Sequence, residues 1–560
     1  MAWLSFAYKK APLRGFFVGL LLLLGSSVSR ADCCAVVSAH PLASEAGMQI
    51  LQQGGNAFDA AVTISAVLAV VEPYGSGIGG GGFWLLHRAR DNFNIMLDGR
   101  ERAPLKAHRD MYLDADGNVI KGLSIDGPLS AGIPGQPAAL VHLAENYGRL
   151  PLSETLAPAI ELAKEGFAVD EVYQRMAGWR RQALMQSSSA TAIFLDNGAV
   201  PEKGHVIRQP ALAETLQLIA AQGRDGFYAG HVGRALLEAV QAAGGIWTEQ
   251  DLQAYQVVER RPLIFNYADM RIISAPLPSS GGMVIAQVLN ILSWFDLSSM
   301  TSVQRKHLLI EAMRRAYQMR ADYLGDEDFV SVPKSRLLDR NYARKLARDI
   351  HASEATASPA DQIQSNEGRD TTHFSVLDAD GNRVAATLSV NYPFGSGFVA
   401  AGTGVLLNDE MDDFSAKPGV ANVYGLIGSR ANAIEPGKRM LSSMTPTFVE
   451  SDDALAILGT PGGSRIISMV LLAILEMQAS DNPQDWVDLP RFHHQYLPDR
   501  VEYEKGAFSE DEINELTLMG HQLEQRQPYG NMQAIYQNRQ TGEVLTASDK
   551  RGIGAGIVKP

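Results

Sequence analysis

Cysteine and basic charge are the two features that this sequence has least of. Only two of the 560 residues are cysteine, and Cys33 and Cys34 are neighbours. No framework of disulfide bonds and no cysteine-rich zinc site is therefore expected. Lysine and arginine number 49 against 62 aspartate and glutamate, which gives a formal net charge of -13. Because the chain has no basic excess, no nucleic-acid partner is predicted.

Long hydrophobic runs are also missing, apart from one near the start of the chain. Lys9, Lys10 and Arg14 precede an apolar stretch at residues 15–25, and small residues at 29–31 suit a signal peptidase. The apolar stretch is too short for a comfortable membrane span. We therefore predict a signal peptide at residues 1–31 and no stable membrane span, with an uncleaved anchor as the alternative.

The predicted signal peptide implies export of the mature protein. Asp32 lies immediately before Cys33, so the cysteines do not support a lipid anchor. We expect the protein to be periplasmic if it is bacterial, with secretion as a further possibility.

Length and composition leave room for a large buried core. With 560 residues, of which 46% are hydrophobic and 20% charged, length alone allows two to four domains. No internal repeat is visible, and only the polar run at residues 351–368 resembles a joint between domains. Patterning predicts helices at 42–53, 57–71, 283–292, 306–323 and 465–477, a mostly helical region at 137–245, and strands at 83–86, 95–98 and 455–458.

The stretch at residues 370–377 is the one around which the chain is organised. A polar run precedes it, and Asp380 and Gly381 separate it from another strand-like run at 384–391. Two such runs around an Asp-Gly turn predict a β-hairpin. In its second strand, residues 385, 387, 389 and 391 should share one face, and 384, 386, 388 and 390 the other.

Folding this hairpin places Thr371 opposite the neighbourhood of Ser389 and Asn391. A hydroxyl and an amide would then lie beside the threonine. We predict that the chain is cut before Thr371, which then serves as an N-terminal nucleophile. A threonine that merely begins a strand is the structural alternative, because β-branched residues fit a pleated surface.

Two further segments of the first half suggest sites. The glycine-rich residues 75–82 contain a match to a dinucleotide fingerprint, but a helix is predicted before them and a strand after them. This order is the reverse of what the fingerprint requires, so close backbone packing beneath a site is expected instead. Arg100, at the end of a predicted strand, could grip a carboxylate in bidentate fashion or lie on the surface.

Three segments of the second half carry chemistry-bearing side chains. Four of the five residues at 409–413 are acidic, which suits a substrate ammonium or a solvated turn; calcium is disfavoured, because the spacing lacks the regular alternation and the glycine of a calcium loop. Gly462 and Gly463 precede a predicted helix, where free N–H groups could stabilise an oxyanion or simply form a turn. His493 and His494 have no suitably spaced ligand partners, so a structural role is favoured over metal binding.

Taken together, the motifs resemble the γ-glutamyltransferases, also called γ-glutamyltranspeptidases or glutathione hydrolases. The resemblance rests on TTHFS at 371–375, NDEMDDFS at 408–415, LSSM at 441–444 and PGGSR at 461–465, with GGGGF at 79–83 and GRERAP at 99–104. It runs from about Val36 to near Asp549 and is strongest to bacterial periplasmic members.

This resemblance implies an α/β (α+β) fold, the N-terminal-nucleophile αββα four-layer sandwich. It also implies that the precursor cuts itself between Asp370 and Thr371. Residues 32–370 would then form a large subunit and residues 371–560 a small one, and the two would assemble as a heterodimer within one composite domain. The freed amine has a reference pKa of about 7.7–8.0 and could act as the base for its own hydroxyl.

The resemblance also assigns roles to individual residues. The catalytic residues would be Thr371 as nucleophile, Ser389 as its hydrogen-bond partner, and Gly462 and Gly463 as the oxyanion hole. The substrate-binding residues would be Arg100, Ser442 and Ser443 for an α-carboxylate, Asn391, Glu410 and Asp413 for an α-ammonium, and Tyr424 as a gate. Ser389 and Glu410 depart from the family pattern: well-known bacterial members have Thr at the first position, and some have Gln at the second.

The implied function is a self-processing γ-glutamyl transferase and hydrolase. Its donors would be glutathione and related γ-glutamyl compounds, its acceptors water, amino acids or peptides, and neither a metal nor an organic cofactor is implied. One alternative is a cephalosporin (glutaryl) acylase of the same fold. Another is a non-catalytic binding homologue that keeps the fold and makes no cut.

Overall fold

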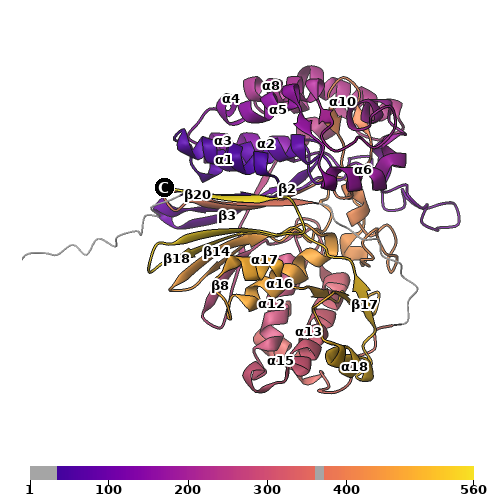
Figure 1. Cartoon of the computed structure of the whole chain (residues 1–560). Helices are drawn as coiled ribbons and strands as arrows, with labels where there is room; N and C mark the ends of the chain where they lie inside the picture. Colours follow the sequence, from indigo (N-terminus) through magenta and orange to yellow (C-terminus); the bar gives the residue numbers. More distant parts are fainter. Residues whose placement is uncertain (1–33, 360–370) are drawn as a thin grey trace, which may run out of the picture.

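Four layers build the part of the chain that the computed structural model describes, residues 34–359 and 371–560. Two β-sheets lie face to face between two layers of helices (Figure 1), so the predicted αββα sandwich is confirmed. The first sheet has the order β20 (Ala555–Lys559), β1 (Cys34–Ser38), β9 (Thr372–Leu377), β10 (Arg383–Ser389), β2 (Gly81–Arg88), β3 (Phe93–Gly99) and β6 (Val258–Arg260). The second has the order β19 (Val544–Ser548), β18 (Gln533–Asn538), β14 (Ala454–Gly459), β13 (Thr447–Glu450), β8 (Met270–Ser274) and β7 (Leu263–Tyr267).

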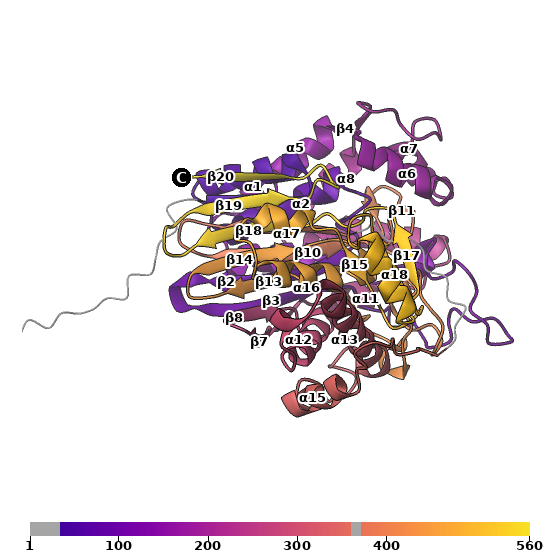
Figure 2. The same cartoon turned by 60° about the horizontal axis from the view of Figure 1, so that its bottom comes forward.

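Helices cover the outer face of each sheet. Over the first sheet lie α1 (Pro41–Gln52), α2 (Ala57–Val71), α3 (Gln136–Asn146), α5 (Ala157–Glu165), α6 (Glu171–Leu184), α8 (Pro210–Gln222) and α10 (Gly230–Ala242). On the side of the second sheet lie α12 (Gly281–Leu292), α13 (Ser302–Tyr323), α15 (Arg340–Arg348), α16 (Ile466–Glu476), α17 (Pro483–Asp488) and α18 (Glu510–Leu518). Figure 2 brings α12, α16 and α17 forward, across the second sheet.

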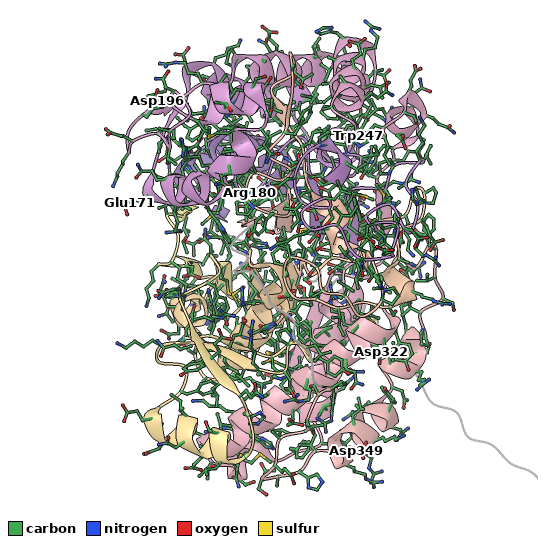
Figure 3. All side chains as sticks on the ribbon, turned by 90° about the vertical axis from the view of Figure 1, so that its right-hand side faces the viewer. Glu171, Arg180, Asp196, Trp247, Asp322 and Asp349 are labelled. Carbon is green, nitrogen blue, oxygen red and sulfur yellow. The ribbon has the colours of Figure 1, made fainter. Side chains whose placement is uncertain are left out.

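Short helices and strands lie in the connections between the longer elements. These short elements are α4 (Leu152–Thr155), α7 (Ser188–Phe194), α9 (Asp225–Tyr228), α11 (Glu249–Ala254), α14 (Lys334–Leu337), β4 (Phe167–Ala168), β5 (Val206–Ile207), β11 (Val399–Ala400), β12 (Val405–Leu406), β15 (Phe492–His493), β16 (Val501–Glu504) and β17 (Leu523–Arg526). In Figure 3, Arg180 and Trp247 lie in the layer over the first sheet, and Asp322 and Asp349 in the opposite one. Side chains fill the space between the layers.

Helix α2 is the central helix of the first layer, and its sequence explains its bounds. Every one of its residues is buried, as expected for a helix that is apolar on all sides. Asn56 caps its start, and Asp59 completes a capping box. The helix ends at Val71, two residues before Pro73, so the predicted bounds are confirmed.

The predicted hairpin is confirmed as strands β9 and β10. They pair in antiparallel register with Thr372 opposite Leu388 and Leu377 opposite Arg383. The side chains of Val384, Ala386 and Leu388 join the core under the helices of the first layer, whereas Ala385 joins the core between the sheets. The alternation predicted from the sequence therefore holds within β10, both faces of which are buried, but the strand ends at Ser389, before Val390 and Asn391.

The two parts of the chain on either side of residue 371 are interleaved rather than separate. Strand β1, from the first part, pairs on one side with β9 and on the other with β20, both from the second. Strand β10 in turn pairs with β2 of the first part. The polar run before Thr371 is therefore not a joint between domains, because both sheets draw strands from both parts.

Some predictions concern residues outside the described ranges. The signal peptide at 1–31, Cys33 and Asp370 fall there, as does the second half of the polar run before Thr371. Within residues 34–359 and 371–560, no helix is both long and apolar enough to cross a membrane.

Replacing Asp378 with Ala should destabilise the fold by about 1–3 kcal/mol, because a buried N–H would lose its acceptor. The Asp378 carboxylate accepts the Ala57 N–H at the start of α2 at 2.9 Å and the Asn382 N–H of its own turn at 2.9 Å. Calorimetry at a fixed scan rate measures the effect as a lower apparent midpoint of thermal unfolding.

Asp380→Ala is the matched control for Asp378→Ala. Asp380 lies in the same turn but pairs with Arg149 in an exposed salt bridge of 2.7 Å. Such pairs contribute less than about 1 kcal/mol. Equal shifts for the two variants would show that Asp378 does not hold α2 to the hairpin.

Candidate active site

One pocket gathers residues from segments far apart in the sequence. It is small, with a cavity volume of about 20 Å³, and lies at the ends of β9 and β10. Every predicted site residue except Gly462 lines it, and the full lining is Arg100, Thr371, Ser389, Asn391, Glu410, Asp413, Tyr424, Leu426, Ser442, Ser443, Met444, Gly463, Ser464 and Ile466. The motifs of both parts of the chain therefore meet at one place in the fold.

Thr371 lies at the head of β9, immediately before its first residue. Its Oγ is 3.2 Å from the Oγ of Ser389 at the end of β10. The Ser389 oxygen also accepts the Asn391 N–H at 2.8 Å, which fixes this hydroxyl relative to the backbone. The structure thus places Thr371 beside Ser389 and Asn391, as the hairpin predicted.

The backbone at Thr371 is strained. Its φ is +93°, a conformation that is a genuine outlier for a β-branched residue. Strain of this kind costs about 1–3 kcal/mol and clusters at functional sites. Because φ is defined across the bond to the preceding residue, cleavage of that bond would remove the constraint.

The glycine-rich segment packs beneath the threonine, as predicted. A Cβ on Gly75 would lie 3.2 Å from the carbonyl oxygen of Thr371. A Cβ on Gly80 would lie only 2.2 Å from the carbonyl oxygen of Ser389, which no side chain tolerates. Glycine is therefore required here for close backbone approach to the site, and no nucleotide-binding loop is formed, because β2 follows the segment.

Arg100 follows the last residue of β3 and is almost wholly buried, so the surface alternative is wrong. Its guanidinium pairs with Glu410 at 2.6 Å and with Asp413 at 2.5 Å. Its backbone is fixed as well: its N–H donates to Asp98 at 2.9 Å, and the Tyr255 hydroxyl donates to its carbonyl at 2.8 Å. The arginine is therefore held rigidly at the pocket wall.

The acidic segment is buried, which excludes the solvated turn considered for residues 409–413. Glu410–Asp413 forms a short 3-10 helix in which Glu410 and Asp413 face Arg100. Asp409 and Asp412 instead support the backbone, since Asp409 accepts the Tyr392 N–H at 2.9 Å and Asp412 the Val423 N–H at 2.8 Å. Across the described residues, no cluster of three His, Cys, Asp or Glu side chains could hold a metal ion.

Three buried carboxyl groups surround Arg100, and one of them, Glu101, was not predicted from the sequence. Burial raises the pKa of Glu410 to about 7 and also raises that of Asp413, although Arg100 opposes both shifts. Burial raises the pKa of Glu101 well above its usual range. Within the described chain neither Glu101 oxygen accepts a hydrogen bond, and the nearer one is 3.5 Å from Arg100. Glu101 belongs to the GRERAP motif, but nothing in the motif indicates its burial.

Ser442 and Ser443 also line the pocket. The Ser442 backbone N–H donates to the carbonyl of Pro278 at 2.8 Å. The Ser443 hydroxyl accepts a long hydrogen bond of 3.4 Å from Arg320 of α13. A guanidinium has no acceptor, so this bond leaves the Ser443 proton free to donate into the pocket. Arg320, fully buried in a helix of ordinary pattern, was not predicted from the sequence.

Tyr424 lines the pocket and lies on a loop that is hydrogen-bonded to the acidic segment. Its hydroxyl donates to the carbonyl of Asn391 at 3.0 Å. The neighbouring Asn422 donates to Asp413 at 3.3 Å, so the loop and the Arg100 cluster are linked. A Cβ on Gly463 would lie 2.7 Å from the Tyr424 ring, which shows how closely the ring covers the glycine turn.

The two glycines of that turn have backbone conformations that other residues rarely adopt. The φ of Gly462 is +138° and that of Gly463 is +57°. Gly463 lines the pocket, whereas the α-carbon of Gly462 faces Met469 of α16, one turn into the helix. Gly463 begins a short 3-10 helix, Gly463–Arg465, that runs into α16, and the first N–H groups of a helix lack helical partners.

His493 and His494 make contacts of a structural kind. His493 is bonded to Ser468 at 2.8 Å and to Gln495 at 2.9 Å, and His494 to Asp499 at 3.2 Å. Both side chains are buried, and their separate partners show that they point in different directions.

Two sandwiched sheets with a threonine nucleophile candidate at the head of a central strand define the class of N-terminal-nucleophile hydrolases. Residues 43–558 match the family described as Gamma-glutamyltranspeptidase. The chain is 44% identical over 508 residues to the Glutathione hydrolase proenzyme of Pseudomonas sp. (strain A14), covering 89% of this chain and 88% of that protein. The chain belongs to the γ-glutamyltranspeptidase family.

Further relatives agree in sequence and in structure. The Glutathione hydrolase proenzyme of Escherichia coli (strain K12) is 41% identical over 534 residues, covering 94% of this chain and 91% of that protein. Among solved structures, the cephalosporin acylase from Bacillus halodurans superimposes with a TM-score of 0.82 at 26% identity, covering 99% of both chains. The fold is therefore shared beyond the proteins named glutathione hydrolases.

The affinity of the pocket for L-glutamate should fall as the pH drops below about 7. The pKa of Glu410 is raised to about 7, so below that pH the side chain is neutral and cannot pair with an ammonium group. The dissociation constant should rise by up to about tenfold per pH unit. Isothermal titration calorimetry at a series of pH values on both sides of 7 measures it.

Glu410→Gln is the control for this pH dependence. The amide keeps the shape of the side chain but does not titrate, so the dependence of the glutamate affinity on pH should flatten. A profile that is unchanged in the variant would mean that another group controls the affinity.

Proposed function

We propose that this protein is a self-processing γ-glutamyl transferase and hydrolase that cleaves the γ-glutamyl amide bond of glutathione and related compounds. One observation carries the proposal: the hydroxyl of Thr371 faces the same pocket as the Arg100, Glu410 and Asp413 cluster. A nucleophile thus lies beside charges of both signs. The relatives are named glutathione hydrolase proenzymes, which supports the same activity and a precursor form.

The charges suit the head of an amino acid. Arg100, with the hydroxyls of Ser442 and Ser443, would bind the α-carboxylate of the γ-glutamyl group. Glu410 and Asp413, with Asn391, would bind its α-ammonium. Arg100 is itself paired with Glu410 and Asp413, so a bound zwitterion would add one charge of each sign to an existing ion-pair network. Tyr424 would close over the bound group.

Catalysis would proceed through an ester. The Thr371 hydroxyl attacks the γ-carbonyl carbon, and its proton passes to the α-amine of the same residue. N–H groups of Gly462 and Gly463 stabilise the resulting oxyanion. The carbon–nitrogen bond then breaks, the amine returns the proton to the leaving group, and a γ-glutamyl ester of Thr371 remains. Water or the amino group of an amino acid or peptide next takes the acyl group and frees the hydroxyl.

The same hydroxyl would make the nucleophile by cutting the precursor. It attacks the carbonyl carbon of Asp370, the peptide bond breaks, and an ester forms between Asp370 and the threonine oxygen. Hydrolysis of that ester leaves a carboxylate on Asp370 and a free amine on Thr371. The products, residues 32–370 and 371–560, would stay together as a heterodimer, because β1 pairs with β9 and β20. The strained φ of Thr371 favours the cut.

Export to the periplasm is part of the proposal. It rests on the signal-peptide pattern at residues 1–31, which predicts Asp32 as the first residue of the mature protein.

A cephalosporin acylase is the second candidate, favoured by the structural similarity to the Bacillus halodurans enzyme. The amino-acid-binding charges argue against it, since a glutaryl group has no α-ammonium for Glu410 and Asp413 to pair with. These carboxylates would then be buried with no substrate charge to offset them.

Thr371→Ala should yield one uncut chain with no turnover of a γ-glutamyl anilide. The variant lacks the oxygen that makes both the cut and the acyl-enzyme, so both should be lost together. Denaturing gels, intact mass and N-terminal sequencing measure the cut, and wild-type protein should give a fragment beginning at Thr371. A cut and active Thr371→Ala protein would refute the proposed nucleophile, and an uncut wild-type protein would favour a non-catalytic homologue.

Wild-type protein should hydrolyse γ-glutamyl anilide at least about a hundredfold more efficiently than glutaryl anilide. The two compounds differ only in the α-ammonium, whose loss removes the substrate's partner for Glu410 and Asp413, and truncating one partner of a buried charge pair costs about 3–5 kcal/mol. The ratio of the kcat/KM values, from release of the anilide, measures the preference. Equal or reversed values would support the acylase instead.

A further inference from the structure

The glycine turn at the pocket needs support from outside itself. Gly462 and Gly463 both have positive φ, and glycine has more backbone freedom than any other residue. Donors that stabilise an oxyanion are effective only when they are held in direction before the reaction. Two adjacent glycines cannot supply that rigidity by themselves.

Contacts from two sides fix the residues that follow. The carbonyl of Ser464 accepts the hydroxyl of Tyr317 at 2.6 Å. The guanidinium of Arg465 pairs with Glu502 at 2.6 Å on the other side. The Arg465 backbone N–H also donates to the carbonyl of Gly462 at 3.2 Å, so the turn has a hydrogen bond of its own. A displacement of Ser464 or Arg465 would therefore also displace the two glycines.

Tyr317 is well placed to hold the turn rigidly. It lies on α13 and is 2% exposed, and burial raises the pKa of its hydroxyl, which keeps the proton needed for donation. Its ring packs edge-on against His493 at 5.3 Å. His493 is in turn held by Ser468 of α16, so the tyrosine is braced against the same helix that the turn begins.

We propose that Tyr317 is a positioning residue for the reaction: by holding the Ser464 carbonyl, its hydroxyl sets the direction in which the Gly462 and Gly463 N–H groups meet the developing oxyanion. This inference rests on the proposed γ-glutamyl chemistry. Tyr317 belongs to the part of the chain before the cut and Ser464 to the part after it. A residue of the large fragment would thus affect the reaction rate at the nucleophile of the small fragment without contacting the substrate.

Tyr317→Phe removes only the hydroxyl and should lower kcat for a γ-glutamyl anilide by about tenfold, less than the 10²–10³ loss seen when an oxyanion donor is deleted. KM and the inhibition constant of L-glutamate should stay unchanged, because ground-state binding uses Arg100, Glu410 and Asp413. A γ-glutamyl analogue with a boronic acid at the reacting carbon forms a tetrahedral anion, and it should bind about tenfold more weakly. Rates are normalised to the amount of cut protein.

Tyr173→Phe is the matched control. Tyr173 of α6 is also fully buried, and its hydroxyl donates to the carbonyl of Phe194 at 2.9 Å, in the helical layer over the first sheet. This variant should lose comparable thermal stability while kcat and boronic-acid affinity stay at wild-type values. The comparison separates loss of a buried hydrogen bond in general from loss of this one.

Several outcomes would overturn the inference. These are an unchanged kcat in Tyr317→Phe, an equal fall in both variants, a parallel rise in KM and the glutamate inhibition constant, or failure of Tyr317→Phe to cut itself. Failure of the proposed function has a different signature: wild-type protein itself would then release no anilide, and both proposals would fall. A normal wild-type rate with any of the outcomes above removes Tyr317 alone.

Discussion

The site depends on the pairing of β9 between two neighbours. Strand β1 holds it on one edge and β10 on the other, and the register sets Thr372 opposite Leu388. Both faces of β9 are buried. A shift of its pairing by one residue would therefore move every side chain of the strand to the opposite face of the sheet, into the other hydrophobic core. This pairing fixes the position of Thr371 beside Ser389, and the rest of the pocket is assembled around that point.

Buried charge shapes the pocket as strongly as the sheet does. Arg100 lies among Glu101, Glu410 and Asp413, and burial raises the pKa of each of these carboxyls. Such a cluster is a poor way to stabilise a fold, because the desolvation of charges offsets much of their mutual attraction. Its presence is explained better by recognition of a charged ligand, a purpose for which a preorganised array of opposite charges is suited.

Local patterns predicted most of the elements, and tertiary burial explains what they missed. The bounds of α2 follow from its capping residues and the hairpin from its Asp-Gly turn, so both could be derived from short windows of sequence. Local patterns left the roles of Arg100 and Gly463 open, and family resemblance decided between the alternatives, because no periodicity places these residues in one pocket. Glu101, Arg320 and Tyr317 were missed. They occupy ordinary strand-end or helix positions, and Arg320 and Tyr317 contact residues more than a hundred positions away in the sequence.

The interleaving of strands from the two parts of the chain affects how the processed protein would refold and unfold. An intact precursor folds as one molecule, whereas chains separated before Thr371 would have to find each other again, with β1 inserting between β9 and β20. Refolding of the processed form is then a bimolecular event that slows with dilution, while unfolding is not. Once processed, the assembly would rely on a high barrier to unfolding rather than on equilibrium, so its lifetime would be set by the rate of unfolding.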